Sequence, residues 1–306
     1  MPRRLAPALA ALGLLALLGL VAAATVAAGP GREASAGSVP AQPGVPARIV
    51  SLNPSLTAIL VALGARDRLV GVDDFSARQQ EAVAELPTVG GLFSPSLEAV
   101  VGLAPDLVVV VPSAEQRDFR ARLAELGVPL LELDPVSFDE VLGTVETLGA
   151  RVGREQAARE RVAEVRRVRR AAEAATAALP RVRGVLVLQR EPLFVAGRGS
   201  FVDEMLAAAG VENLGAAFPE PWPRASREWL IAAAPELILD VAKPDLEVGA
   251  FWARWPSLPA VRDGRVVPLA QGTVALPGPY LDQALRSLVG AAHGPEAARA
   301  LDRATR

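Results

Sequence analysis

The chain contains a stretch of fifteen residues that recurs in its second half. SLEAVVGLAPDLVVV, residues 96–110, matches SREWLIAAAPELILD, residues 226–240, at one constant offset. Both copies begin with Ser, place Glu two positions later, and reach Ala-Pro before an apolar run. Each copy predicts a Ser-capped helix, a stop at the Pro and then a buried strand. The recurrence predicts a structural duplication, with two lobes of similar build.

Strand-like and helix-like segments alternate in both halves of the chain. In the first half we expect strands near 48–52, within RLVGVDDF (68–75), and at 107–111 and 130–133, with helical stretches between them. In the second half, RGVLVLQ predicts a strand, SFVDEMLAAAG a helix, and GRVVPLAQG a further strand. Strands that alternate with helices and are joined by short turns favour parallel sheets.

The middle of the chain has a different pattern, since apolar residues recur at helical spacing among dense Arg and Glu. A helix from about Arg154 to Ala178 would be roughly 35–40 Å long at 1.5 Å per residue. Its apolar positions include Val162, Val165, Val168 and Ala172. The predicted fold class is therefore α/β, with two similar α/β lobes with parallel sheets joined by one long α-helix. We place the lobes at 47–140 and 181–306 and the helical connection at 141–180.

The N-terminus has the pattern of an export signal. Two Arg precede an apolar, Leu- and Ala-rich run that ends in small residues. This predicts a secretory signal peptide over 1–28, and an uncleaved membrane anchor is the alternative because the run is long enough to span a bilayer. Residues 29–46, rich in Gly, Pro, Ala and Ser, predict a disordered tether. The folded part is expected outside the cytoplasm, in the periplasm or an equivalent space.

The sequence does not match the residue patterns of common catalytic sites. The chain has no Cys and a single His, His293, which is expected at a helix end before Gly294. A Ser-His-Asp site or a His-based metal site would lack partners, so we do not expect an enzyme. The stretch AGRGS, residues 196–200, predicts a turn and a helix cap by Ser200 and Asp203 rather than a nucleotide site. A net charge of −2 gives no overall basic footprint for nucleic acid.

The positions of the aromatic residues point to binding of a ligand rather than to catalysis. Loops at the ends of strands line the ligand sites of open α/β sheets. Only 4% of the residues are aromatic, yet five aromatic residues fall in segments expected to be such loops. We predict that these five bind ligand between the lobes: Phe75, Phe93, Phe194, Trp222 and Tyr280. Trp222 is the strongest of them because its flanking prolines hold the backbone stiffly.

Three segments carry a resemblance to a known family. They are RIVSLNPSLTAILVALGA, VGGLFSPSLEAVVGLAPDLVVV and PWPRASREWLIAAAPELILD, and Pro-Trp-Pro followed by Ser-x-Glu is the most specific feature. Together they resemble the periplasmic cobalamin-binding proteins of ABC importers, within a wider class that also binds iron siderophores and haem. The resemblance covers nearly all of the chain after the signal segment. It implies an exported, monomeric solute-binding protein that captures a corrinoid between its lobes and delivers it to an ABC permease.

The resemblance also suggests a role for the repeated acid. In this class one surface Glu per lobe, similar in position to Glu98 and Glu228, docks into an Arg pocket on one of two identical permease subunits. A pair of matching carboxylates would suit a two-fold symmetric partner. The residues alone leave a second interpretation open, because a Glu in the first turn of a helix interacts favourably with the helix dipole.

The resemblance implies a ligand that brings its own metal, so the chain itself needs no cofactor. Direct ligation of haem iron fits poorly, since Tyr280 is the only Tyr and Met205 the only Met beyond the initiator. The segment GTVALPGPY, residues 272–280, is apolar where the cobalamin branch usually carries polar residues. A ferric siderophore or haem-like chelate is therefore the alternative ligand, and an exported sensor domain with this fold is the alternative function.

Overall fold

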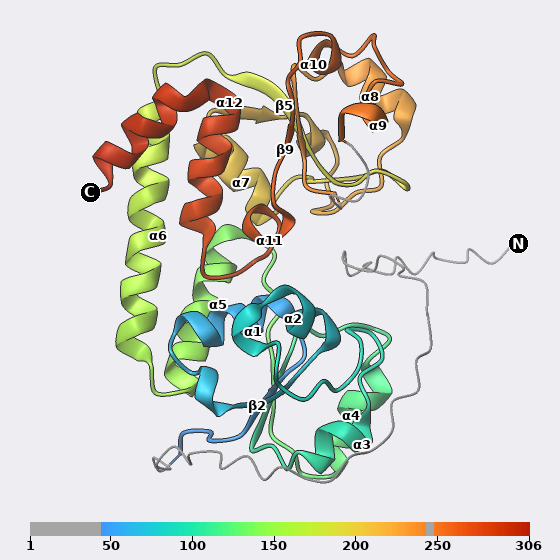
Figure 1. Cartoon of the computed structure of the whole chain (residues 1–306), viewed down its shortest axis with the longest axis vertical. Coiled ribbons are helices and arrows are strands. Elements are labelled where there is room, and N and C mark those ends of the chain that lie inside the picture. Colours follow the sequence, from blue (N-terminus) through green and yellow to red (C-terminus); the bar gives the residue numbers. More distant parts are fainter. Residues whose placement is uncertain (1–43, 243–247) are drawn as a thin grey trace, which may run out of the picture.

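The computed structural model describes residues 44–242 and 248–306, which form two α/β lobes with the helix α6 (Glu155–Thr176) running along one side of both (Figure 1). The predicted signal peptide, 1–28, and the predicted tether up to residue 43 lie outside the described residues. Pro46, at the end of that tether, accepts a hydrogen bond from the buried Arg68. No helix in the described part of the chain is both long and apolar enough to cross a membrane.

The first lobe is built on a parallel sheet whose strand order, in the described residues, is β2-β1-β3-β4. Its strands are β1 (Ile49–Ser51), β2 (Leu69–Val72), β3 (Leu107–Val110) and β4 (Leu130–Glu132). Its helices are α1 (Pro54–Ala62), α2 (Asp74–Gln79), α3 (Leu97–Gly102) and α4 (Arg117–Glu125). These strands lie where the sequence predicts them.

The second lobe has a sheet in the order β6-β5-β8-β9, with β7 also paired to β5, as far as the chain is described. Its strands are β5 (Val182–Gln189), β6 (Phe194–Val195), β7 (Val211–Asn213), β8 (Leu237–Asp240) and β9 (Val266–Pro268). Its short helices are α7 (Phe201–Ala208), α8 (Arg227–Ala233), α9 (Val248–Trp252), α10 (Pro259–Arg262) and α11 (Gln271–Val274). All pairings are parallel except that of β6 with β5, so one short antiparallel strand departs from the predicted pattern.

The two lobes repeat the same arrangement, because β2-β1-β3-β4 corresponds to β7-β5-β8-β9. The correspondence extends to details around the repeated stretch. Arg48, before β1, donates to the carbonyls of Leu103 and Ala104 at the end of α3, and Arg183, in β5, donates to the last carbonyl of α8. Ala104 and Ala234 both have a positive φ, 45° and 47°, immediately before a proline. The sequence repeat is thus a structural duplication.

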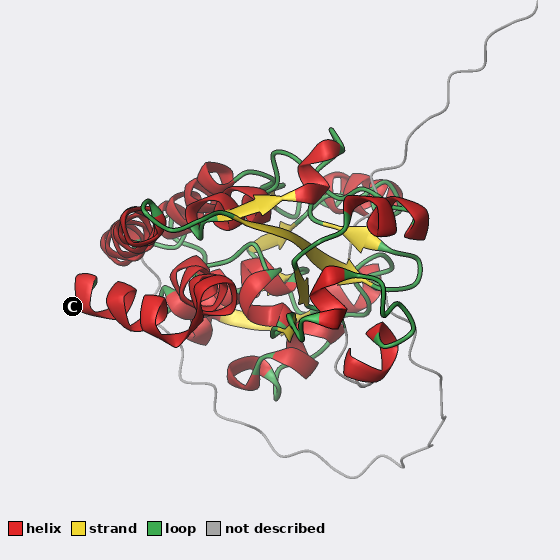
Figure 2. Cartoon of the chain, turned by 90° about the horizontal axis from the view of Figure 1, so that it is seen from above, coloured by secondary structure: helices red, strands yellow, loops and turns green. Residues whose placement is uncertain are grey.

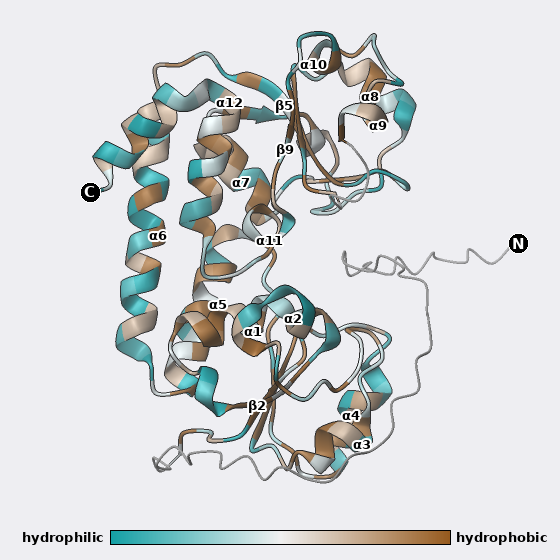
Figure 3. Ribbon diagram, viewed as in Figure 1, coloured by the Kyte–Doolittle hydropathy of each residue, from teal (hydrophilic) through white to brown (hydrophobic). Residues whose placement is uncertain are grey.

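Helices enclose the strands, and seen from above they lie on both sides of them (Figure 2). Figure 3 shows that the strands of both lobes are mainly hydrophobic, whereas α6 alternates between hydrophilic and hydrophobic residues along its length. This fits burial of both faces of a parallel sheet and of only one face of a surface helix.

The connection between the lobes begins with α5 (Phe138–Arg151), turns at residues 152–154 and continues as α6. The predicted apolar face of α6 is buried: Val162, Val165, Val168 and Ala172. It packs against α5 and against the final helix, α12 (Leu281–Ala304), and an Arg161–Asp282 ion pair joins α6 to α12. Helix α12 breaks at Gly294, where φ is 83°, so its first part ends at His293 as expected. One long helix therefore joins the lobes.

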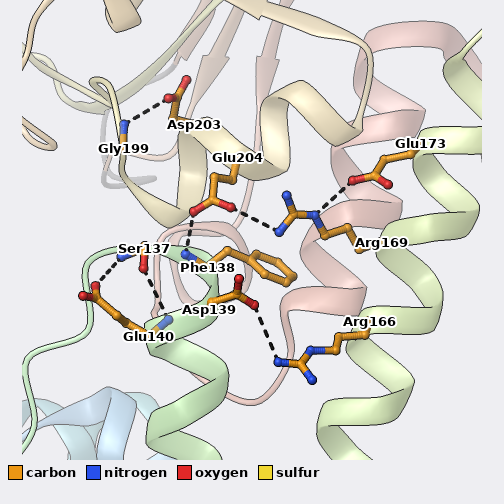
Figure 4. A network of polar contacts seen from close by, with 10 residues as sticks. All are labelled: Ser137, Phe138, Asp139, Glu140, Arg166, Arg169, Glu173, Gly199, Asp203 and Glu204. Carbon is orange, nitrogen blue, oxygen red and sulfur yellow. Dashed lines mark hydrogen bonds and ion pairs between the residues drawn. The ribbon is translucent and has the colours of Figure 1, made fainter.

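A set of polar contacts ties this connection to the second lobe (Figure 4). Glu204, in α7, accepts the backbone N–H of Phe138 at the start of α5 (2.9 Å) and pairs with Arg169 of α6 (3.2 Å). The Arg169 guanidinium also lies over the Phe138 ring, 4.5 Å from its centroid. We call Glu204, Phe138 and Arg169 the interlobe clamp. Beside it, the backbone N–H of Phe201 donates to the carbonyl of Val136 (2.7 Å), which gives a second direct link between the lobes.

Candidate ligand-binding site

A cavity of about 310 Å³ lies between the lobes and is lined from both. The first lobe contributes residues that follow its strands β1, β3 and β4, and the second contributes β5, α7, α11 and the turn at 221–222. The carboxyl ends of parallel strands are where open α/β sheets bind ligands. Lining residues from the first lobe include Leu52, Asn53, Phe93, Ser113, Gln116 and Asp134. Those from the second lobe include Leu188, Phe201, Trp222, Gln271, Leu276 and Pro277.

Trp222 is held at the cavity by its backbone neighbours. The carbonyls of Pro221 and Pro223 accept hydrogen bonds from Gly197 and Val195, at 2.8 and 3.2 Å. A Cβ on Gly197 would lie 2.0 Å from the carbonyl oxygen of Glu220, so only glycine allows this close approach. The indole packs in a T-shaped arrangement against the buried Phe201, with 5.7 Å between ring centroids. The segment is therefore a fixed support for an aromatic side chain at the cavity.

The structure brings two of the five predicted aromatic residues, Phe93 and Trp222, into the cavity lining. The other three lie outside that lining. Phe75 lies in α2 rather than in the expected loop, because Asp73 caps a helix at this point, and Arg78 lies over its ring at 4.8 Å. The exposed Tyr280 immediately precedes α12. Phe194 is not in a loop, as the sequence suggested, but in strand β6, where it is buried in the core. A role in ligand binding remains a prediction for all five.

Sequence reasoning missed the polar residues of the cavity. Asn53, Ser113, Gln116, Asp134 and Gln271 all line it. The first four follow the carboxyl ends of β1, β3 and β4, and that position was the one signal in the sequence that could have found them. Asn53 also caps α1, since its side-chain oxygen accepts the N–H of Ser55 at 2.9 Å.

Asp134 is the one ionisable side chain among the described residues that line the cavity. It is exposed at the cavity's edge, and no described residue donates a hydrogen bond to its carboxylate or pairs with it. Partial desolvation by the surrounding protein, together with repulsion from Glu140, raises the pKa of the Asp134 carboxyl above its ordinary value. Glu140 itself accepts N–H groups of Ser137 and Val136, and these hydrogen bonds lower its pKa.

The two repeated acids lie outside this cavity's lining, at matching places on α3 and α8. Glu98 and Glu228 are both exposed and occupy the first turn of their helices. The preceding Ser caps each helix: Ser96 accepts the N–H of Ala99 and Ser226 that of Trp229. Hydrogen bonds from the Glu228 backbone N–H and the Ser226 hydroxyl lower the pKa of the Glu228 carboxyl.

The AGRGS stretch forms the predicted turn and helix cap. Ser200 accepts the N–H of Asp203 at the start of α7, and the Asp203 carboxylate accepts the N–H of Gly199 and the side-chain amide of Asn213. The helix N-terminus thus already carries a carboxylate, and this leaves an anionic phosphate disfavoured there. Across the described residues, no group of three or more His, Cys, Asp or Glu side chains is arranged to hold a metal ion.

The chain belongs to the periplasmic binding protein family, whose model matches residues 49–271. This family is a class of solute-binding proteins rather than of enzymes, and it places the folded chain outside the cytoplasm. The match covers the first lobe, the helical connection and the second lobe up to the start of α11, and therefore includes all of the polar residues named above.

Individual relatives are similar over most of the chain. The vitamin B12-binding protein of Pectobacterium carotovorum is 28% identical over 224 residues, which cover 71% of this chain and 80% of that protein. The solved structure of the periplasmic haem-binding protein RhuT from Roseiflexus is 29% identical in sequence, with a TM-score of 0.70 over 85% of this chain and 99% of that one. The periplasmic vitamin B12-binding protein of Vibrio cholerae, at 23% identity and a TM-score of 0.68, covers 85% of this chain and 98% of its own and shares the fold.

Proposed function

We propose that this chain is an exported solute-binding protein that captures a corrinoid in the cavity between its lobes and delivers it to an ABC permease. The observation that carries the proposal is the rigid Pro-Trp-Pro segment, which places Trp222 at a mainly apolar cavity lined from both lobes. An aromatic side chain on a fixed backbone offers a large contact area to a flat macrocycle at small entropic cost. The similarity to vitamin B12-binding proteins supports the same ligand class.

A haem-like chelate or a ferric siderophore is the second candidate ligand. It is supported by the similarity to the haem-binding protein RhuT, at 29% identity. Within the described lining no His, Tyr or Met faces the cavity, and Tyr280 lies outside it. Haem iron would then need both axial ligands from elsewhere, whereas a corrinoid or a siderophore brings its metal fully chelated. The corrinoid is the better match, and the chain in this proposal has no cofactor of its own.

Docking to the permease is proposed to use the outer surfaces of α3 and α8. Each presents Glu98 or Glu228 and, three residues later on the same helix face, an exposed aliphatic side chain. These are Val101 and Ile231, which expose 39% and 46% of their surface. A pair of equivalent acid-plus-aliphatic patches, one per lobe, fits a partner with two identical subunits. Arg side chains on that partner would complete the charge complementarity.

The proposal also includes export through a cleaved signal peptide at 1–28, followed by a tether at 29–46. The exported protein is proposed to be a monomer. A retained N-terminal segment would instead anchor the same binding protein to the membrane.

The ligand class can be tested from the visible spectrum. The chain is incubated separately with cyanocobalamin, haemin and a ferric hydroxamate, passed through a desalting column and scanned. The proposal expects the corrinoid spectrum to co-elute with the protein at a stoichiometry near one. Retention of haemin or the ferric chelate alone would replace the corrinoid by the second candidate, and retention of none would refute a chelate-binding role.

A further inference from the structure

Gln116 brings an unused hydrogen-bond acceptor to the cavity. The residue is 2% exposed, and its side-chain Nε2 donates to the carbonyl of Leu92. This contact fixes the orientation of the amide, because only the NH₂ group can donate to a carbonyl. Its Oε1 is buried, and no described residue donates to it. A buried acceptor without a partner is costly, so this atom is suited to a ligand group that donates a hydrogen bond.

Ser113 and Asp134 add two further polar side chains to the lining of the cavity. The Ser113 hydroxyl is also buried without a partner among the described residues. Asp134 adds a carboxylate, which only accepts hydrogen bonds when ionised. No residue of the described lining balances this charge, since the lining includes no Lys, Arg or His. Asn53 and Gln271 also line the cavity, with amides that both donate and accept. What distinguishes the first lobe's side of the lining is therefore the unpartnered Gln116 acceptor and one negative charge.

The candidate chelates differ in the hydrogen-bonding groups and the charge at their edges. A corrinoid carries neutral primary amides around its ring, and each amide has two N–H donors. Haem carries two propionates, which are ionised at neutral pH and can only accept. Acceptors facing acceptors gain no hydrogen bond, and a second negative charge close to Asp134 is repelled across a partly desolvated site.

We infer that Asp134 and Gln116 make the cavity selective for chelates whose polar edge donates hydrogen bonds and carries no carboxylate. This inference rests on the proposed function, because it assumes that the cavity is where the chelate binds. Asp134 repels anionic ligands at the edge of the cavity, while Gln116 accepts an amide N–H within it. Discrimination against carboxylates is thus built into the first lobe, whereas the aromatic surface for the ring comes mainly from Trp222 in the second.

The test compares ligands that share one ring. Cyanocobalamin and its monocarboxylates, made by mild acid hydrolysis of single peripheral amides, have nearly the same size and the same metal. Isothermal titration calorimetry with the full chain should give about tenfold tighter binding of the amide form than of the monocarboxylates, an order-of-magnitude estimate for one unfavourable charge contact. Haemin should bind more weakly than either.

Variants assign the effect to its residues. Asp134→Asn keeps an acceptor oxygen and removes the charge, so the ratio between the affinities for the amide and carboxylate corrinoids should fall to about twofold, whatever the variant does to cyanocobalamin binding itself. Asp134→Glu should retain the discrimination. Gln116→Leu should weaken cyanocobalamin about five- to tenfold. Glu125→Gln, an equal charge change on the exposed end of α4, is the control and should leave both affinities unchanged. The melting temperature of each variant should be measured to check that it is folded.

The outcomes separate the two proposals. Equal affinity of the wild type for the amide and carboxylate corrinoids, or an unchanged ratio in Asp134→Asn, would overturn the selectivity while leaving corrinoid capture intact. Tighter binding of haemin than of cyanocobalamin would overturn both. The expected ratio in the wild type and its loss in Asp134→Asn alone would establish the selectivity.

Discussion

Trp222 makes two kinds of contact, since its indole lines the cavity and also packs on Phe201. Trp222→Ala should therefore weaken corrinoid binding by about 1–3 kcal/mol and also lower the melting temperature. Trp229→Ala is the matched control: Trp229 is likewise half-buried, packs on Phe218 at 4.9 Å and lies outside the cavity. Calorimetry and thermal unfolding should show a stability loss in both variants but an affinity loss in Trp222→Ala only. If Trp222→Ala bound the corrinoid as tightly as the wild type, Trp222 would serve packing alone and not ligand binding.

Asp73 gives a pH-dependent prediction. It caps α2 by accepting the N–H groups of Phe75 and Ser76, yet burial raises the pKa of its carboxyl above the ordinary 3.8. The folded state therefore binds this proton more tightly than the unfolded state does. The contribution of this group to stability is fully present below pH 3.8 and is lost as the pH rises through the raised folded pKa.

Asp73→Asn keeps the capping oxygen and removes the buried charge. Urea unfolding at pH 7 should find the variant at least as stable as the wild type, and its advantage should shrink as the pH falls toward 4. A variant that is less stable at pH 7 and gains on acidification would show the opposite sign.

Part of the site could be predicted from single residues and part could not. Trp222 was identifiable because prolines on both sides predict a fixed, loop-borne aromatic. Phe194 was misplaced because β6 has only two residues and forms by antiparallel pairing with β5, so its sequence carries no strand period. Gln116 and Asp134 were missed because an isolated polar residue after a strand has no distinctive spacing. Their importance depends on a cavity that exists only once both lobes are in place.

The duplicated helices α3 and α8 carry the docking proposal. Glu98→Ala and Glu228→Ala should each slow association with the permease and reduce its salt dependence, because rim charges act mainly by steering. The double variant should be slower still, and solute affinity should stay unchanged in all three. Arg replacements should be worse than Ala, since they would set like charges against each other. Transport into reconstituted vesicles measures the effect.

Glu146→Ala, on the exposed side of α5, is the control for that series. If the two acids served only the helix dipole, each Ala variant would melt at a slightly lower temperature and transport normally. Wild-type transport by the double variant would rule out docking through these residues.

Most of the elements could be predicted because their signals are local. The Ser caps, the Pro stops and the helical period of the apolar residues in α6 all lie within one turn or one strand of the element they define. The missed strand β7 has three residues and pairs only with the first half of β5, so its sequence carries little periodicity. Its existence follows from the duplication, since it corresponds to β2.

The two lobes are held in one arrangement by α6 and by the interlobe clamp. A long helix without an internal Pro offers few hinge positions, and Glu204 joins α7 directly to the start of α5. Small-angle scattering should therefore show only a small change in radius of gyration on ligand binding. A large closure of the wild type would contradict a rigid connection.

The contribution of the clamp can be separated from that of the helix. Glu204→Ala should lower the free energy of unfolding by about 1–2 kcal/mol and enlarge the ligand-induced change in radius of gyration. Glu173→Ala is the control, because Glu173 pairs with the same Arg169 but lies within α6. It should leave the scattering unchanged.

The most direct measurement is a crystal structure of the chain with cyanocobalamin. We expect the corrin ring between the lobes, with Trp222 and Phe93 against it, one or more of its amides donating to Gln116 or Asp134, and Glu98 and Glu228 free of any contact with the ligand. A corrinoid bound on the outer surface of a single lobe, or one that leaves Trp222 untouched, would contradict capture in the interlobe cavity.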